Sequence, residues 1–322
     1  MTRNVVVTCN QLGHSVIAVD ADDYTEIARI PTLPEPHMVV FDERRRKLYV
    51  AITYRDGFYD VHGDRGTEIT VIDVDSWRIT GVLDIAPYAG PHDMFVDPVR
   101  DLLHIACESH GGCVALVDLT EQRLVGHIET DTAGPHWIAA LPDHTKAYTG
   151  NKEATFVSVL DLGQRAMAGK IPMPNGSEDL EVSADGRFLF ANDRDRPLLH
   201  IIDTATDTEI DVVELPDNPH RIHLTNTGLA VVSHFHLEKW RFDQSTPGSV
   251  SVIDTTTRAH VAHVEVGPGP LGITSDPDGS RIFVDNASAA TMSVINTSTW
   301  QVDRTVPMDR GAHDVVYLRL SD

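Results

Sequence analysis

A strand-and-turn pattern recurs seven times along the chain and restricts the folds that are open to it. Each copy runs alternating apolar residues into an acid or an amide, as in SVIAVD ending at Asp20 and SVSVID ending at Asp254. A short polar turn and a further strand follow each copy, and another strand precedes it. The other five copies end at Asp73, Asp118, Asp161, Asp203 and Asn296. Four strands in a repeat of about 42 residues predict the blade of a β-propeller, with the terminal acids holding the turns.

The two ends of the chain fit together in this pattern. The segment GAHDVVYLRL near the C-terminus looks like an innermost strand with no blade after it, whereas NVVVTCN near the N-terminus starts at a second strand. Joined, the two would share one blade, fasten the ring and remove exposed sheet edges. The sequence therefore predicts an all-β, seven-bladed β-propeller with four-stranded blades, as a single domain over residues 1–322.

The repeats also resemble a known family. The stretch PLGITSDPDGSRIFVDNASAATMSVINTSTWQV is similar to the YVTN repeats of the YncE-like seven-bladed propellers, and the resemblance covers nearly the whole chain. It implies a fold and leaves the activity open, because such propellers include binding proteins, lyases and metalloenzymes.

Composition excludes several kinds of partner. A formal net charge of -22 would repel nucleic acid and anionic bilayers over most of the surface. No stretch approaches the roughly 20 apolar residues of a membrane span, and the N-terminus lacks an apolar leader segment. We expect a cytoplasmic protein, monomeric or weakly homo-oligomeric, that acts on a small molecule and binds neither nucleic acid nor membrane. Cys107 and Cys113 flank a tight loop, and whether they are bonded is left open.

Histidine recurs at one position of the repeat, the start of each predicted innermost strand. Pro-His pairs occur there in PEPHMVVFDE, AGPHDMFVDP and AGPHWIAALP. The seven residues at this position, called here the histidine register, are His37, His92, His136, Glu178, His220, Leu271 and His313. Because innermost strands line the channel of a propeller, five imidazoles and one carboxylate are expected at one channel mouth.

A metal ion would satisfy these imidazoles. Crowded ring nitrogens need partners, and protonated neighbours repel one another. We expect two or three of the five histidines of the register to bind a divalent transition metal, Fe, Zn, Cu, Mn or Ni, and the others to orient these ligands or bind substrate. Alternatively, each histidine bonds carbonyls of the neighbouring blade and lines a hydrated channel. Leu271 interrupts the set and leaves an apolar gap in which an organic ligand would pack.

Two insertions point to the same end of the predicted channel. YRDGFYDVHGDRG and HFHLEKWRFDQSTPG lengthen loops that emerge beside the register, where insertions commonly mark a binding face. The expected acids and bases are Glu178, His110, His234 and His236. The expected substrate contacts are Tyr54, Arg55, Glu108, Lys152, Arg194 and Leu271.

These features predict a metal-dependent enzyme with a histidine-rich site at the channel mouth. It would use Lewis-acid chemistry, as a lyase, hydrolase or isomerase, on a small carbonyl-bearing molecule. The resemblance to propeller lyases supports this interpretation by analogy. A non-haem iron or copper oxygenase or oxidase is a second hypothesis, and a non-catalytic propeller that binds a ligand or a protein is a third.

Overall fold

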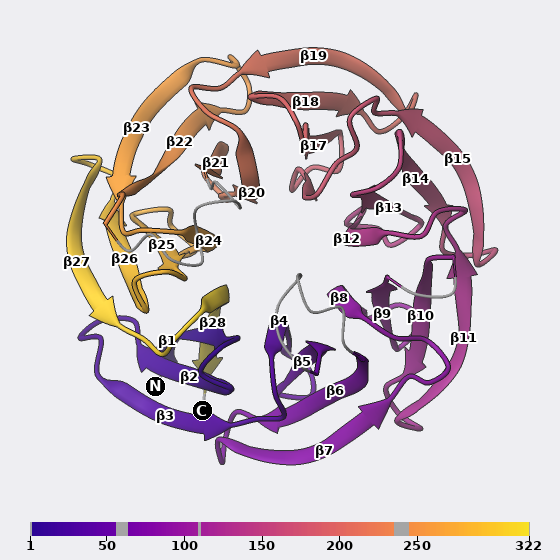
Figure 1. The fold of residues 1–322 in the computed structure, drawn as a ribbon, viewed down its shortest axis with the longest axis horizontal. Coiled ribbons are helices and arrows are strands. Elements are labelled where there is room, and N and C mark those ends of the chain that lie inside the picture. The colour runs from indigo at the N-terminus through magenta and orange to yellow at the C-terminus, as the bar shows by residue number, and fades with distance from the viewer. Residues whose placement is uncertain (1, 56–63, 109–110, 235–244, 322) are drawn as a thin grey trace. The chain divides into compact units, whose positions relative to one another are not determined.

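The chain folds into β-sheets joined by short turns (Figure 1). The computed structural model describes residues 2–55, 64–108, 111–234 and 245–321. Every regular element in these ranges is a strand, and the 28 strands form seven four-stranded sheets. The fold class is therefore a seven-bladed, all-β propeller with four-stranded blades, as the repeat predicts. The described residues include no helix of the length and apolar character that a membrane span needs.

The described chain divides into two compact units. The first unit comprises Met1–Asp64, Thr70–Val82 and Thr225–Asp322, and the second comprises Arg65–Ile69 and Leu83–Leu224. That residues 1–322 act as a single domain stays a prediction.

Two complete sheets lie in the first unit. One has the order β28-β1-β2-β3, with β28 at Ala312–Ser321, β1 at Thr2–Asn10, β2 at Ser15–Asp20 and β3 at Glu26–Pro31. The other has the order β24-β25-β26-β27, with β24 at Pro270–Ser275, β25 at Arg281–Asn286, β26 at Thr291–Asn296 and β27 at Gln301–Pro307.

Three complete sheets lie in the second unit. The first is β8-β9-β10-β11, with β8 at Pro91–Asp97, β9 at Leu102–Cys107, β10 at Cys113–Asp118 and β11 at Arg123–Glu129. The second is β12-β13-β14-β15, at Pro135–Ala140, Lys146–Asn151, Phe156–Asp161 and Ala166–Pro172. The third is β16-β17-β18-β19, at Leu180–Val182, Phe188–Asn192, Leu198–Asp203 and Thr208–Glu214.

The remaining two sheets have the same strand order. One is β4-β5-β6-β7, at Pro36–Asp42, Lys47–Tyr54, Arg65–Asp73 and Arg78–Asp84. The other is β20-β21-β22-β23, at Pro219–Leu224, Leu229–His234, Gly248–Asp254 and His260–Val266.

The two ends of the chain share one blade, as predicted. Strands β1 and β28 pair antiparallel from Thr2 opposite Ser321 to Cys9 opposite Asp314, and Figure 1 shows them side by side near the N and C labels. Leu318 and Leu320 of β28 join a buried cluster of this unit, so the last strand contributes core as well as hydrogen bonds.

The middle strands are buried on both faces, which explains why their sequences are apolar almost throughout. All six residues of β9, LLHIAC, are buried. Neighbouring blades of the second unit pack Ala106, Leu116 and Leu160 into one cluster. In the first unit Val6, Phe283 and Val315 belong to a comparable cluster. Burial of these side chains between sheets is the main stabilising contribution that the sequence pattern provides.

The acids at the ends of the third strands hold the turns, as predicted. Asp161 Oδ1, for example, accepts the backbone N–H of Gln164 at 2.8 Å, and Asn296 Oδ1 accepts that of Ser298 at 2.9 Å. Four residues after each acid or amide the backbone enters the left-handed region. These residues are Tyr24, Trp77, Gln122, Arg165, Asp207, Arg258 and Trp300, with φ between 52° and 65°. One turn geometry therefore recurs in every blade.

Aspartates next to the histidine register tie neighbouring blades together. The carboxylate of Asp314 accepts the N–H of Val39 at 2.8 Å, that of Asp93 accepts Ile138 at 3.1 Å, and that of Asp179 accepts Ile222 at 2.8 Å. Gly272 has no room for a side chain, because a Cβ atom there would lie 2.7 Å from the Asp314 Cα. These contacts fix where the innermost strands begin, and hence where the register residues lie.

Candidate functional site

A second repeated position lies beside the histidine register. Its residues donate their backbone N–H to the carbonyl of the glycine two residues before a register residue. The pairs are Gln11 with Gly311, Glu108 with Gly90, Lys152 with Gly134, Arg194 with Gly176 and Ala287 with Gly269, at 2.8 to 3.3 Å. We call this the second-strand position. In the second unit it carries three charged side chains, whereas in the first unit its described residues are neutral.

The backbone of Glu178 is held by a hydrogen bond to the side-chain amide of Asn192 and not by pairing with a neighbouring strand. The sequence places it at the start of an innermost strand, which is wrong, because β16 begins at Leu180. The Asn192 Oδ1 accepts the backbone N–H groups of Glu178 and Asp179, both at 2.9 Å. Its Nδ2 donates to the carbonyl of His220 at 2.7 Å. Asn192 is fully buried, so it holds Glu178 and His220 in fixed relation.

The Glu178 carboxylate contacts two basic groups. Its Oε1 lies 3.2 Å from the Lys152 Nζ and 3.6 Å from the His220 Nε2. Burial opposes ionisation of this carboxyl, but the positive charges of Lys152 and of His220, which is protonated in the acid range where Glu178 titrates, outweigh it and lower the pKa of Glu178 to about 2. The carboxylate is therefore ionised at neutral pH.

His220 is neutral at the same pH. Burial lowers its pKa to about 4, against the opposing effect of the Glu178 carboxylate. The neighbouring Arg221 guanidinium lies 3.5 Å from the centroid of the Trp137 ring, a cation–π contact between the starts of two innermost strands. Arg194 donates to the backbone carbonyl of Lys152, which ties the two cationic second-strand residues together. The arrangement joins an ionised carboxylate, an ammonium and a neutral imidazole.

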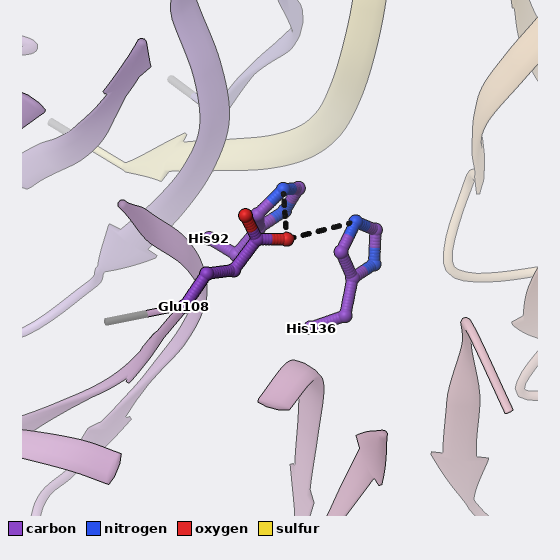
Figure 2. A group of neighbouring side chains, drawn as sticks. All are labelled: His92, Glu108 and His136. Atoms are coloured by element: carbon purple, nitrogen blue, oxygen red, sulfur yellow. Dashed lines mark ion pairs between the residues drawn. The ribbon is translucent and has the colours of Figure 1, made fainter. Parts of the chain in front are cut away.

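A second carboxylate in this unit lies between two imidazoles. Figure 2 shows His92, Glu108 and His136 pointing toward one another. The Glu108 Oε1 is 3.4 Å from the His92 Nε2 and 3.7 Å from the His136 Nε2. One ligand atom from each residue lies within 4.8 Å of the others, so the three together can hold a metal ion. Among the residues that the structure describes, this is the one group of His, Cys, Asp and Glu with that spacing.

The first unit holds a similar pair of rings. The His37 and His313 rings are tilted against each other with centroids 3.8 Å apart, and those of His92 and His136 are 3.7 Å apart. The His313 Nδ1 donates to the carbonyl of His37 at 3.1 Å, as the His136 Nδ1 does to that of Glu178 at 3.2 Å. These are the bonds to neighbouring-blade carbonyls that the alternative interpretation of the register expects.

The other predicted site residues have separate environments. His234 is buried and hydrogen bonds through Nε2 to the Ser251 hydroxyl at 2.7 Å. Tyr54 meets the His37 ring edge-on at 5.8 Å, Leu271 is buried in β24, and Arg55 is exposed. His110 and His236 lie outside the described residues. Convergence of all five register histidines on one centre stays a prediction.

The cysteine pair is placed as its spacing suggests. Cys107 and Cys113 lie directly opposite each other across β9 and β10, and both are free, buried thiols. Glu108 is the residue directly after Cys107, so the end of β9 sets the direction of the Glu108 side chain.

Sequence reasoning missed the role of asparagine at the ends of second strands. Asparagine ends NVVVTCN, KAYTGN, FLFAN and RIFVDN, a recurrence that was visible in the sequence. In three blades its amide bonds within its own sheet, as Asn151 does to Ser158 at 2.9 Å. The three are Asn10, Asn151 and Asn286. Asn192 differs because it reaches two register residues, and no local pattern distinguishes it from the others.

Comparison with known proteins finds relatives of similar sequence but no matching family model. No family model matches the chain, so membership of the YncE-like family stays a prediction. The chain is 26% identical over 211 residues to the 6-phosphogluconolactonase of Yersinia pestis (strain Pestoides F), a match over 57% of this chain and 60% of that protein. It is 26% identical over 220 residues to the 6-phosphogluconolactonase of Yersinia enterocolitica, a match over 61% of this chain and 63% of that protein. The chain therefore matches about three fifths of these relatives' length.

Solved structures share the fold. The Pseudomonas aeruginosa periplasmic gluconolactonase PpgL superposes with a TM-score of 0.77 at 17% identity, over 99% of each chain. Hydrazine synthase of Kuenenia stuttgartiensis superposes with a TM-score of 0.74 at 16% identity, over 90% of this chain and 96% of that one. At these identities the likeness concerns the fold alone.

The predicted function is wrong in view of these names. A Lewis-acid metalloenzyme with a histidine-rich site at the channel mouth, whose reaction was left among lyase, hydrolase and isomerase, does not agree with relatives named as lactonases, which are hydrolases of sugar lactones. The oxygenase and the non-catalytic alternatives disagree with those names as well. The group that has the spacing of metal ligands contains two register histidines and Glu108, which was assigned to substrate.

Proposed function

We propose that the protein hydrolyses a small sugar-derived lactone at the site formed by Glu178, Lys152 and His220. The observation that carries the proposal is the Glu178 carboxylate, which lies 3.2 Å from an ammonium and 3.6 Å from an imidazole. His136 and Arg194, which contact the backbone of Glu178 and of Lys152, are also polar. Such a set suits a polyhydroxylated substrate better than an apolar one. Relatives named for 6-phosphogluconolactone and gluconolactone support the same substrate class.

Lactone hydrolysis requires a base, a cation and an acid at one place. His220, neutral at pH 7, takes a proton from water as the water oxygen adds to the lactone carbonyl carbon. The ionised Glu178 facing its Nε2 stabilises the imidazolium that forms, and the Lys152 ammonium stabilises the negative charge that develops on the carbonyl oxygen. The ring C–O bond then breaks, and the alkoxide oxygen that leaves takes the proton from His220. The product is the open hydroxy acid.

The experiment measures acid release in a pH-stat from glucono-δ-lactone and from 6-phosphogluconolactone, with spontaneous hydrolysis subtracted. Glu178→Gln keeps the shape of the side chain and removes its charge. We expect kcat/KM to fall by about 10²- to 10⁴-fold, because the carboxylate that stabilises the His220 imidazolium is lost. Glu121→Gln, in an exposed turn of the same unit, is the matched control and should keep full activity.

Two outcomes oppose the proposal. Rates on both lactones equal to the spontaneous rates would reject lactone hydrolysis for these substrates. Full activity in Glu178→Gln, with hydrolysis intact in the wild type, would reject this site while keeping the reaction. A preference for the phosphorylated lactone would indicate that Lys152 and Arg194 also receive an anion.

A further inference from the structure

The side chains of His92, Glu108 and His136 are spaced more like the ligands of one metal ion than like polar groups that hydrogen bond directly to one another. Its members come from the innermost strands of two neighbouring blades and from the end of β9, all within the second unit (Figure 2). Their exposed fractions are 0%, 8% and 2%, so bulk water does not solvate the atoms that face one another.

The protonation of His136 follows from its backbone contact. Its Nδ1 lies 3.2 Å from the carbonyl oxygen of Glu178, which can only accept a hydrogen bond. Nδ1 therefore carries the proton, and in the neutral ring Nε2 presents a lone pair. That lone pair faces the Glu108 Oε1 at 3.7 Å. The Arg65 guanidinium lies 3.9 Å from the other carboxylate oxygen, Oε2. A cation held between Oε1 and Nε2 would remove the repulsion between these two electron-rich atoms.

The distances fit a shared ion better than direct hydrogen bonds. The Glu108 Oε1 lies 3.4 and 3.7 Å from the two Nε2 atoms, beyond the usual length of a charge-assisted hydrogen bond. Nitrogen and oxygen ligands that bind one tetrahedral ion at about 2.1 Å lie about 3.4 Å from each other. The carboxylate oxygen is thus spaced from each of the two ring nitrogens like a fellow ligand of a single ion.

Neighbouring groups orient these ligands. The hydrogen bond from the His136 Nδ1 to a backbone carbonyl is the usual outer contact of a metal-binding histidine. The backbone N–H of Glu108 donates to the Gly90 carbonyl at 3.1 Å, and Arg65 donates to the Glu108 carbonyl. Both contacts fix the direction of the Glu108 side chain without using its Oε1.

We propose that His92, Glu108 and His136 bind one divalent transition-metal ion of the zinc class through His92 Nε2, Glu108 Oε1 and His136 Nε2. Two imidazoles and one carboxylate are a ligand set that such ions accept, and three protein ligands leave a position for water. The proposal does not depend on the proposed hydrolysis. It assigns no catalytic role to the ion.

The test uses the full chain without a polyhistidine tag, stripped with a chelator and titrated with Zn²⁺ by calorimetry. We expect one equivalent to bind. His92→Ala and Glu108→Gln should each weaken Zn²⁺ binding by at least about 100-fold, since loss of an outer partner alone costs 10- to 100-fold. Co²⁺ in place of Zn²⁺ should give the absorption bands of a low-symmetry, four-coordinate site in the wild type and not in these two variants.

His313→Ala is the matched control. His313 belongs to the same register and stacks on a second imidazole in the same way, but it has no place in a group with metal-ligand spacing among the described residues. It should bind one equivalent of Zn²⁺ with wild-type affinity. Melting temperatures of all variants show whether a lost equivalent reflects unfolding.

Proton NMR on the wild type keeps the proposal falsifiable if the variants do not fold. Long-range ¹H–¹⁵N spectra of the metal-free protein should show His136 as the neutral Nδ1–H form, and Zn²⁺ should shift its Nε2 resonance. Failure to bind Zn²⁺ at micromolar concentration would overturn the proposal. So would an imidazolium at His136 that persists at pH 8, or loss of the ion in His313→Ala with retention in Glu108→Gln.

Discussion

The two pairs of tilted imidazole rings differ in the residue that lies beside them. In the first unit His37 and His313 are accompanied at the second-strand position by Gln11, and in the second unit His92 and His136 are accompanied by Glu108. Gln11 and Glu108 make the same backbone bond to a glycine and differ in one atom of the side-chain head. Repetition of the fold therefore supplies the imidazoles in both units, and the residue at the second-strand position is an amide in the first unit and a carboxylate in the second.

The largest expected effect comes from a truncation that destabilises the first unit and leaves the second unit folded. Removing residues 313–322 deletes most of β28, including buried Leu318 and Leu320, and unpairs β1. We expect a loss of several kcal/mol of unfolding free energy in the first unit, since one buried leucine alone contributes about 2 to 5 kcal/mol. Hydrogen exchange should show lost protection in β1 and β2, and retained protection in β9 and β13.

A chain shortened by only two residues keeps both leucines and should behave as the full chain does. Equal loss of protection in both units of the longer truncation would mean that they unfold as one.

Making the second unit resemble the first should remove most of the proposed activity. Lys152→Gln places at this position the amide that the first unit has at Gln11. We expect kcat/KM on the lactone to fall by about 10²- to 10³-fold, because a group that stabilises developing oxyanion charge is lost. Gln11→Ala should leave kcat/KM unchanged. An equal decrease in both variants would assign the loss to folding.

Making the first unit resemble the second should create a second metal site. Gln11→Glu places a carboxylate beside the His37 and His313 pair, where the Gln11 amide now donates to Glu35 at 3.3 Å. We expect calorimetry to report two equivalents of Zn²⁺ for this variant and one for the wild type. A single equivalent with unchanged affinity would show that the carboxylate is not the deciding difference between the units.

Acid should weaken the second unit through His220. Its folded pKa of about 4 lies below the value near 6.5 expected of an unfolded chain, so the unfolded state binds the proton more readily. Stability from this group is complete above pH 6.5 and is lost as the pH falls toward 4. Between pH 7.0 and 5.5 we expect a loss of about 1 kcal/mol, measured as a shift in urea midpoint. Glu178, Lys152 and Arg221 face His220, so His220→Gln is the variant that isolates it, and its midpoint should fall less over this range.

The smallest effect should be the same in both units. Asp161→Ala in the second unit and Asn296→Ala in the first each remove one turn acceptor of the shared geometry. We expect each to lower the unfolding free energy by about 0.5 to 1 kcal/mol, the net contribution of such a hydrogen bond. Thermal denaturation that separates the two variants by more than this would show that the turns are not equivalent.

The fold could be predicted because its signals are local and repeated. Seven strands that each end in an acid or an amide indicated the number of blades, and the mismatched chain ends indicated the shared blade. The register was also visible, since Pro-His pairs recur at one phase of the repeat. Only Glu178 deviates there, because the Asn192 amide replaces the ladder that would have started β16 two residues earlier.

The sequence predicted several residues of the candidate site but not the contacts between them. Glu108, Lys152 and Arg194 were singled out as loop residues near the register, but their partners depend on contacts between blades. Glu108 meets His136 from the next blade, and Glu178 meets Lys152 from the preceding one. Such pairings follow from the spacing of sheets and from backbone bonds to glycine, which no window of sequence contains. The choice of reaction failed for the same reason, since five histidines at one phase do not reveal which carboxylate each one meets.

The shared blade has a consequence for the order in which the protein matures. Every strand of the second unit has been synthesised once Leu224 is made, whereas the first unit also needs β28 at Ala312–Ser321. About 100 residues separate these events, and at 5 to 20 residues per second the ribosome needs roughly 5 to 20 s to add them. The second unit, which carries Glu108, Lys152 and Arg194 at the second-strand position, is thus available for folding before β28 has been made and can pair with β1. During that interval the exposed edge of β1 is the part of the nascent chain most open to pairing with another strand.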